Sequence, residues 1–413
     1  MNHLIRTLLL EWKDRKLPEV TKRDISINLS ENNDVNNAIV VTGFRRVGKT
    51  YIVLEKISEL LQKYTREDVI YINFEDERIA NPTTDLLTDL LSETKSLFGK
   101  KPKFLFLDEL QLVPNWSKWV RRILDTEDIK LIITGSSSKM GSSELPTELR
   151  GRSEEIKVDP LNFNEFLRFK GQEKNKSVML FDEYLIYGGL PAVVLSPVEK
   201  KFELLQSYYR TVVQREIIDR HRIKNENVLK TLLNLVINSN YITISRLFNT
   251  LKSLGFPVGK TTIDKYISYI KSSYFLEELN FFNYKIINQL MYPRKNYFVD
   301  TGFISSLSTR FSKNMGRLFE NMVYQKLKSS NENIFYWKDD KNREVDFVVL
   351  EAEKVKSLYQ ACYDISDDET LEREVKSLLR AKKLLNCEDL NIITINMPKN
   401  IKEFKGIKII SII

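Results

Sequence analysis

One eight-residue motif constrains the fold of this chain more than any other feature. Residues 43–50 read Gly-Phe-Arg-Arg-Val-Gly-Lys-Thr, which fits the pattern GxxxxGK[ST] of phosphate-binding loops. An apolar run at 38–41 precedes the motif, and a helix-like segment at 51–57 follows it. Gly43 and Gly48 would let the backbone curl so that successive N–H groups face a phosphate. A strand, this loop and a helix together predict an α/β nucleotide-binding domain.

The side chains of the loop have defined expected roles. Lys49 would reach the β- and γ-phosphates of a nucleotide, and the Thr50 hydroxyl would hold Mg²⁺. Arg45 and Arg46 would either touch phosphate or stay solvated at the loop surface. We therefore expect ATP as the ligand, ADP as its product and Mg²⁺ as the metal. The predicted nucleotide-binding residues are Gly43, Phe44, Arg45, Arg46, Val47, Gly48, Lys49, Thr50 and Tyr51.

Apolar runs of strand length place this loop in a sheet. They lie at residues 38–42, 69–74, 103–107 and 129–134, and helical or loop sequence separates each run from the next. Such alternation predicts a parallel β-sheet with helices on both faces. A short amphipathic helix is expected at 1–16, and the Gly/Ser-rich stretch 139–155 is expected to form a loop near the nucleotide.

Two carboxylates follow the third apolar run. Asp108 is expected to help hold Mg²⁺, and Glu109 is placed to polarise a water for attack on the γ-phosphorus. Ser136 follows the fourth run and would sense the γ-phosphate or the attacking water; the alternative is a plain Ser-rich turn. Glu75 and Asp76 are expected near the site entrance rather than in the chemistry.

Arg150 and Arg152 are candidates for an arginine finger. An arginine beside the γ-phosphate neutralises charge in the transition state. These two would act either within the chain or on a neighbouring subunit, and a solvated basic loop is the alternative interpretation.

The middle of the chain has the pattern of a helix-turn-helix. Helical sequence at 177–222 is interrupted by a turn at 187–191, and three short amphipathic helices follow, with Thr243 as the cap of the second and Gly255 at its end. The stretch 275–299 suits a β-wing. In a DNA-binding role, Lys260, Thr261, Thr262 and Lys265 would enter a major groove. The alternative is a lid or a protein-docking module.

The last hundred residues form a separate αβ pattern. It comprises a helix at 316–328, strands at 334–337, 344–350 and 357–365, a charged helix at 369–383 and a final strand at 391–395.

These motifs resemble those of a known group. Residues 43–50, 107–111, 134–137 and 149–152 resemble the archaeal and bacterial AAA-type ATPases. More narrowly, the segments 187–191, 297–302 and 316–321 are similar to the group in which that domain is joined to a winged helix and a degenerate PD-(D/E)xK domain, which is restriction-endonuclease-like. The resemblance implies an α/β chain with a P-loop ATPase domain at 1–170, a helical and winged-helix domain at 171–300 and a small αβ nuclease-like domain at 301–413.

The resemblance also defines a nuclease-like site that departs from the pattern. Glu320 and Asp346 match its acidic positions, but the third acid is replaced by Gln360 and the lysine two residues later by Cys362. A nuclease needs carboxylates around Mg²⁺ and a lysine near the attacking water. We therefore expect no DNA cleavage, and a domain kept for binding or packing.

Composition narrows the partners. The net charge of +8 and pI near 9 favour a polyanion such as double-stranded DNA, although the nucleotide is also an anion. Only Cys362 and Cys387 are present, which excludes a disulfide framework and favours a reducing, cytoplasmic compartment. The chain has no secretory pattern at its start and no apolar run approaching about 20 residues, so no membrane association is expected.

Three functions compete at this point. The first is Mg²⁺-dependent ATP hydrolysis that moves the winged-helix and nuclease-like parts, with DNA as the favoured partner. The second is a slow nucleotide-dependent switch that binds protein partners or forms a homo-oligomer. The third is an ATP-dependent nuclease, against which Gln360 and Cys362 count. Glu109 favours the first, because a pure switch has no need of a carboxylate that polarises water.

Overall fold

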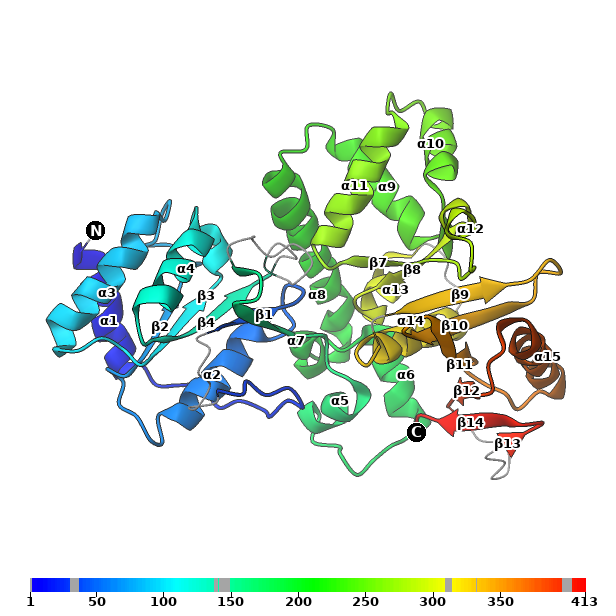
Figure 1. Ribbon diagram of the computed structural model, residues 1–413, viewed down its shortest axis with the longest axis horizontal. Helices are drawn as coiled ribbons and strands as arrows, with labels where there is room; N and C mark the ends of the chain where they lie inside the picture. Colours follow the sequence, from blue (N-terminus) through cyan, green and yellow to red (C-terminus); the bar gives the residue numbers. More distant parts are fainter. Residues whose placement is uncertain are drawn as a thin grey trace. The chain divides into compact units, whose positions relative to one another are not determined.

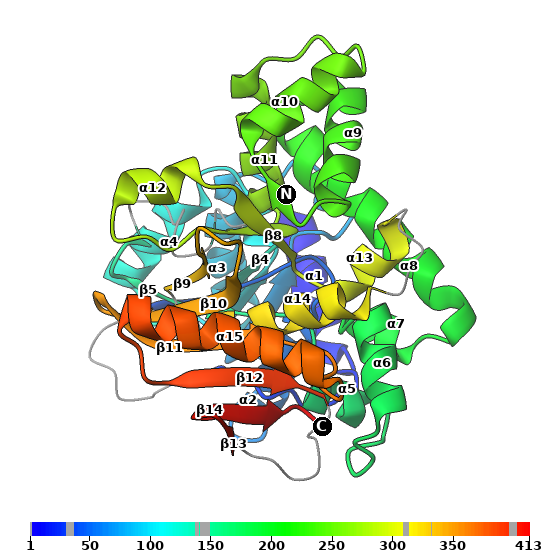
Figure 2. The same cartoon turned by 90° about the vertical axis from the view of Figure 1, so that its right-hand side faces the viewer.

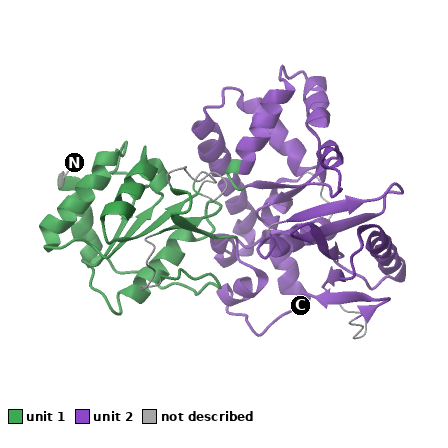
Figure 3. Ribbon diagram, viewed as in Figure 1, with its two compact units in different colours: residues 1–159, 272–274 green, residues 160–271, 275–413 purple. Residues whose placement is uncertain are grey.

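The computed structural model of this protein describes residues 2–29, 37–136, 140, 149–308, 314–331, 333–395 and 403–413 (Figure 1). The chain divides into two compact units (Figure 3). Unit 1 comprises Met1–Asp159 with Ser272–Tyr274, and unit 2 comprises Pro160–Lys271 with Phe275–Ile413.

Unit 1 is built on a five-stranded sheet in the order β2-β3-β4-β1-β5, in which every neighbouring pair is parallel. The strands are β1 Ala38–Thr42, β2 Val69–Asn73, β3 Phe104–Asp108, β4 Lys130–Gly135 and β5 Ser153–Lys157. The first four are continuous apolar runs, as expected for strands that are buried on both faces. The predicted parallel sheet is therefore confirmed.

The helices of unit 1 cover both faces of this sheet. They are α1 Asn2–Asp14, α2 Lys49–Leu60, α3 Thr84–Phe98 and α4 Trp116–Thr126, with a 3₁₀ turn at Leu110–Leu112. Figure 1 shows α2 on one side of the sheet and α4 on the other. The predicted amphipathic helix at the start is α1, and its Trp12 indole donates a hydrogen bond of 2.8 Å to the carbonyl of Val69. Because all strands are parallel, the carboxyl ends of β1, β3 and β4 meet at one edge.

The expected loop at 139–155 is wrong at its end, because residues 153–157 form the edge strand β5. Its sequence Ser-Glu-Glu-Ile-Lys has one apolar residue and lacks the apolar run of a buried strand. The strand forms because its backbone pairs with β1. Residues 139 and 141–148 of that expected loop lie outside the described residues.

Unit 2 begins with helices that bear out the expected pattern. They are α5 Phe163–Phe169, α6 Val178–Tyr187, α7 Pro191–Leu195 and α8 Val198–Thr211, which continues as a π-helix over Val212–Asp219. The three short helices follow as α9 Glu226–Ile237, α10 Ile244–Ser253 and α11 Lys260–Ser272. Thr243 caps α10 as predicted, because its hydroxyl accepts a hydrogen bond of 3.1 Å from the Arg246 N–H. Figure 2 shows α9, α10 and α11 gathered together.

A small antiparallel sheet accompanies these three helices. Its strands, in the order β6-β8-β7, are β6 Tyr241–Ile242, β7 Leu276–Leu279 and β8 Arg294–Phe298. A short helix that the sequence pattern did not indicate, α12 Ile286–Met291, lies between β7 and β8, and α13 Thr301–Leu307 follows the sheet.

The remainder of unit 2 is a six-stranded mixed sheet in the order β13-β14-β12-β11-β10-β9. Its elements are α14 Met315–Lys328, β9 Ile334–Lys338, β10 Glu344–Glu351, β11 Lys354–Ala361, α15 Asp368–Leu385, β12 Leu390–Thr394, β13 Glu403–Phe404 and β14 Ile407–Ser411. Helix α15 packs its apolar side on this sheet (Figure 2). The prediction that the strand at 391–395 is the last was wrong: β14 pairs parallel with β12 and buries Ile407 and Ile409.

Candidate functional site

The loop at 43–50 has a backbone that only glycine allows at its first position. Gly43 has φ +142°, and a Cβ there would come within 2.2 Å of the Val158 carbonyl oxygen. Gly48 has φ +98° and directly precedes α2. The loop therefore curls tightly into the first turn of a helix, where the backbone N–H groups and the helix dipole favour an anion.

Lys49 points back into this loop. Its side chain is buried, and Nζ donates to the carbonyls of Gly43 at 3.1 Å and Phe44 at 3.2 Å. The same Nζ lies 3.9 Å from Oε1 of Glu109. The ammonium is therefore held between the loop and the acidic end of β3.

Asp108 is the most heavily hydrogen-bonded carboxylate of this site. Its Oδ2 accepts from the Thr50 hydroxyl at 2.9 Å and from the Tyr71 hydroxyl at 2.8 Å, and its Oδ1 accepts from the Thr134 hydroxyl. Burial raises the pKa of Asp108, while these hydroxyl donors oppose the rise and the charge of Glu109 adds to it. Thr50 and Asp108, the two predicted metal residues, thus lie side by side with hard oxygen atoms of the kind that Mg²⁺ prefers.

Glu109 adopts a backbone conformation that is unusual for its residue type. Its φ is +56°, in the left-handed region, which a non-glycine residue occupies at a free-energy cost of about 1 to 3 kcal/mol. Its N–H donates to the Thr134 hydroxyl at 3.0 Å, and the Gln111 side-chain amide donates to its Oε2. The surrounding hydrogen bonds hold the carboxylate at the same edge of the sheet as Lys49.

The other predicted residues of unit 1 fall into three groups. Ser136 directly follows β4, whose Gly135 pairs with Thr42, so the buried serine emerges beside the start of the loop. Phe44 and Val47 are buried in the core, whereas Tyr51 and Arg46 are exposed. Arg45 forms an ion pair of 2.6 Å with Glu75, the acid expected near the entrance.

The structure does not bring Arg150 and Arg152 to this edge. The Arg152 carbonyl accepts from the N–H of Ala38, at the start of β1, and its guanidinium pairs with Asp125 at the end of α4. Because β5 runs parallel to β1, these arginines precede the amino end of the strand while the loop follows the carboxyl end. A five-residue strand spans roughly 16 Å, so an arginine finger acting within the chain is not supported by this geometry.

Three polar side chains of this site were missed as functional residues. Tyr71, Gln111 and Thr134 contact Asp108 or Glu109, yet only Thr134 and Gln111 stand within the motifs that the sequence singled out. The sequence signal for Tyr71 and Thr134 was a hydroxyl within an otherwise apolar strand. That signal can be interpreted only once the sheet order is known, because β2 and β4 bring these hydroxyls to Asp108 as the two neighbours of β3.

The predicted DNA-contacting residues lie at the start of α11. Lys260, Thr261 and Lys265 are exposed and Thr262 is half-buried. The Lys260 ammonium donates to the Ser245 hydroxyl of α10 at 3.1 Å. The apolar residues expected in the core of this helix, namely Ile263, Ile267 and Ile270, are buried.

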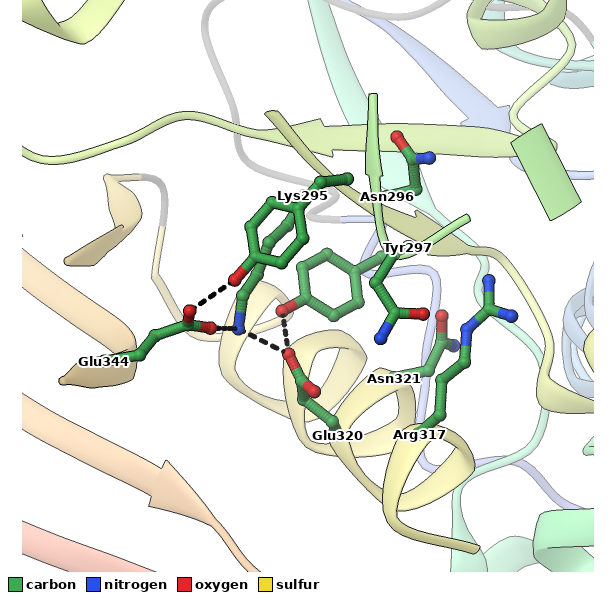
Figure 4. Close-up of a pocket in the computed structure, with 9 residues that line it drawn as sticks. Lys295, Asn296, Tyr297, Arg317, Glu320, Asn321 and Glu344 are labelled. Atoms are coloured by element: carbon green, nitrogen blue, oxygen red, sulfur yellow. Dashed lines mark hydrogen bonds and ion pairs between the residues drawn. The ribbon is translucent and has the colours of Figure 1, made fainter. Parts of the chain in front are cut away.

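The expected nuclease-like residues form a second polar cluster in unit 2. Lys295, which no sequence motif indicates, lies between Glu320 and Asp346, and its Nζ is 2.7 Å and 2.9 Å from their carboxylate oxygens. Gln360 lies beside them: its side-chain oxygen accepts from the Asp346 N–H at 3.3 Å, and its amide donates to Glu374. Figure 4 shows Lys295 of β8 directed towards Glu320 of α14 and Glu344 of β10.

The segments 187–191 and 297–302 meet at a buried carboxylate. Asp300 accepts from the N–H of Gly189 at 2.7 Å and from the N–H of Gly302 at 2.9 Å. Burial raises the pKa of Asp300 to about 6, against the two N–H donors that lower it. These motif residues therefore close a turn inside unit 2.

The loop, the all-parallel sheet and the acid-bearing strand define the class of unit 1 as a P-loop ATPase fold. Residues 35–167 match the family model described as an AAA domain. Residues 179–314 and 315–411 match two further models, each described as a domain of unknown function (DUF8612 and DUF4143).

Relatives of the whole chain are known. The uncharacterized protein MJ1544 of Methanocaldococcus jannaschii is 38% identical over 399 residues, which span 92% of this chain and 86% of the relative. The chain therefore belongs to the MJ1544 family. An uncharacterized protein of Haemophilus influenzae is 26% identical over 369 residues, spanning 88% of this chain and 91% of that protein.

Among solved structures, the Walker-type ATPase paby2304 of Pyrococcus abyssi is similar at a TM-score of 0.47 and 14% identity, covering 66% of this chain and 91% of that one.

No helix among the described residues is long and apolar enough to cross a membrane.

Proposed function

We propose that unit 1 binds ATP with Mg²⁺ and hydrolyses it. The observation that carries this proposal is the convergence of Lys49, Thr50, Asp108 and Glu109 at the carboxyl edge of a parallel sheet. The contacts that join them are the Thr50–Asp108 hydrogen bond of 2.9 Å and the Lys49–Glu109 approach of 3.9 Å. The match of residues 35–167 to an AAA domain supports the same conclusion.

Each side chain then has a chemical task. The N–H groups at the start of α2 and the Lys49 ammonium bind the β- and γ-phosphates. Glu109 accepts a proton from the attacking water, and Gln111 keeps its carboxylate in place. Ser136, at the end of β4, contacts the γ-phosphate or that water. Thr50 and Asp108 would hold Mg²⁺, which would screen the negative charge of the phosphates.

Glu109→Gln is the test of hydrolysis. We expect the variant to bind ATP as the wild type does and to turn it over at least about a hundredfold more slowly, because a carboxamide of the same shape does not accept a proton. Phosphate release and equilibrium binding of a fluorescent ATP analogue, measured with Mg²⁺, separate the two effects. Glu59→Gln is the matched control, since that carboxylate on α2 is exposed and pairs with Lys56. Unchanged turnover in Glu109→Gln would remove this residue from its role.

For unit 2 we propose that its winged-helix part binds duplex DNA and that the nucleotide state of unit 1 controls this binding. Support comes from the three helices α9 to α11, the small sheet that accompanies them, and the net charge of +8 of the whole chain. The start of α11 carries two exposed lysines, an exposed threonine and a half-buried one, and these suit phosphate and base contacts respectively.

DNA binding is tested by the double variant Lys260→Ala/Lys265→Ala. We expect weaker binding to duplex DNA and a slope of log affinity against log salt that is shallower by about 1 per lost phosphate contact. Fluorescence anisotropy across a salt series measures both. Lys230→Ala on the neighbouring helix α9 is the control, because that exposed lysine pairs with Glu226. An unchanged slope in the double variant would exclude this face of α11.

One observation favours the second candidate, a nucleotide-dependent switch that binds a protein partner. Helix α12 exposes Ile286, Ile287, Leu290 and Met291, each at least 69% accessible. Apolar side chains of this kind suit a protein partner better than a phosphate backbone. A chain that hydrolyses ATP slowly and has no measurable affinity for duplex DNA at low salt would favour this function.

A further inference from the structure

Lys295 holds an ammonium group among carboxylates from two other elements. Its Nζ lies 2.7 Å from Glu320 of α14, and 2.6 Å and 2.9 Å from Glu344 and Asp346 of β10. The lysine itself belongs to β8, and its side chain is only 5% exposed. Figure 4 shows the amine between Glu344 and Glu320.

The carboxylates are fixed by further donors. The Tyr297 hydroxyl donates to Glu320 at 2.7 Å, and the Tyr241 hydroxyl donates to Glu344. The second oxygen of Asp346 accepts from the Ala361 N–H at 3.0 Å. The acids are therefore held in position around one point, and the ammonium occupies that point.

The negative charge of the three carboxylates requires a cation at the centre of the cluster. Asp346 is buried and Glu320 and Glu344 are half-buried, so without a counter-ion these carboxylates would lose much of their hydration, at a cost of up to several kcal/mol per ion. Burial opposes the charge on Lys295, but Asp346, Glu320 and Glu344 outweigh it and hold the pKa of the ammonium well above its usual value. Burial raises the pKa of Asp346 to about 7, although Lys295 opposes the rise. The acids thus stabilise the charged form of the lysine.

A carboxylate cluster of this kind is also the donor set of a divalent cation, which would take oxygens at about 2.1 Å from its centre for Mg²⁺. Here the ammonium binds one oxygen from each acid at 2.6 to 2.9 Å, so the centre of the cluster is filled. As they stand around the ammonium, the acids are not spaced for a metal ion, since among the residues that the structure describes no group of three His, Cys, Asp or Glu is arranged to hold one. Metal binding therefore requires the acids to close in after the ammonium is removed.

We infer that Lys295 is a built-in cation that takes the place of a divalent metal in this acidic site, excludes metal from it, and ties β8 to α14 and β10. The lysine comes from the stretch 179–314 and the acids from 315–411, which match different family models. The ion cluster therefore joins these two parts of unit 2. It also gives a physical reason for the expected lack of nuclease activity beyond the replacement of one acid by Gln360.

Lys295→Met tests this inference, because methionine has a similar shape and no charge. We expect a lower thermal midpoint in metal-free buffer and a new Mn²⁺ site: saturating Mn²⁺ at about 100 times its dissociation constant would raise the midpoint by roughly 5 to 10 °C. The wild type should show neither binding at this site nor the shift. Lys338→Met is the matched control, since Lys338 lies 3.8 Å from Glu344 but is partly exposed.

All variants are made in an Asp108→Asn background, so that Mn²⁺ bound near the nucleotide loop does not contribute. Electron paramagnetic resonance counts the bound Mn²⁺, and the further change Asp346→Asn assigns it to this cluster. Stoichiometric Mn²⁺ binding to the background protein that is lost on Asp346→Asn would overturn the inference. A folded Lys295→Met variant that binds no Mn²⁺ would overturn it as well.

If Lys295→Met does not fold, chemical rescue of Lys295→Ala tests the same inference. In Lys295→Ala the truncated side chain leaves space beside the acids, so added propylammonium should raise the thermal midpoint of this variant and not that of Lys338→Ala. The same rise with an equal concentration of tetramethylammonium, which has no N–H donor, would contradict the assignment of a specific cation site.

Discussion

Replacing Lys49 by alanine is expected to reduce the affinity for ATP by about a hundredfold or more, and turnover with it. In the structure the ammonium is buried and donates to two carbonyls of the loop, at 3.1 Å and 3.2 Å. On phosphate, the same donors would form charge-assisted hydrogen bonds that contribute about 1.5 to 3 kcal/mol each. Alanine removes them and leaves the loop N–H groups as the remaining phosphate contacts.

Equilibrium binding of a fluorescent ATP analogue and the thermal shift with ATP measure this loss. Lys56→Ala is the control, because Lys56 stands on the same helix and pairs with Glu59. The Lys49→Ala and Glu109→Gln variants should differ in kind, since the first loses binding and the second keeps it. A Lys49→Ala variant with wild-type affinity would place the nucleotide elsewhere in the chain.

The elements of unit 1 were predictable where the signal is contiguous. The loop at 43–50 is recognisable from its motif. The four apolar runs are recognisable because a strand buried on both faces needs consecutive apolar residues. β5 lacks this signal, since an edge strand is held by backbone bonds to β1 and tolerates Glu154 and Glu155. The sheet order was not predictable from these runs, and with it the convergence of Tyr71 and Thr134 on Asp108.

Lys295 shows a different limit. A search for the lysine of an acidic site looks along the strand after Asp346, where Lys354 and Lys356 stand. In the structure Lys356 is paired with Glu351 at 2.6 Å, away from the cluster. The ammonium comes instead from β8, 51 residues before Asp346. Sequence spacing does not reveal such a contact. The ammonium has only to lie beside the acids in space, and a strand that is distant in the sequence can provide it.

Gly188→Ala is expected to destabilise unit 2 by about 4 kcal/mol or more. Gly188 has φ +77° and ψ −170°, a region that is essentially restricted to glycine. A Cβ at this position would lie 1.7 Å from Oδ1 of Asp300, far inside van der Waals contact. Asp300 is buried and cannot retreat without releasing the N–H groups of Gly189 and Gly302. Strain and the loss of two charge-assisted hydrogen bonds therefore add.

Gly171→Ala separates these two contributions. Gly171 has φ +66°, yet nothing lies within 4 Å of the Cβ that alanine would add, so only the backbone cost of about 1 kcal/mol is expected there. Urea unfolding followed by tryptophan fluorescence and circular dichroism compares the two variants. If they lose equal stability, the contact with Asp300 contributes nothing and φ alone explains the glycine. A loss in Gly188→Ala that exceeds that in Gly171→Ala by more than the about 1 to 3 kcal/mol of the glycine-only backbone region shows that the Asp300 carboxylate also requires glycine at this position.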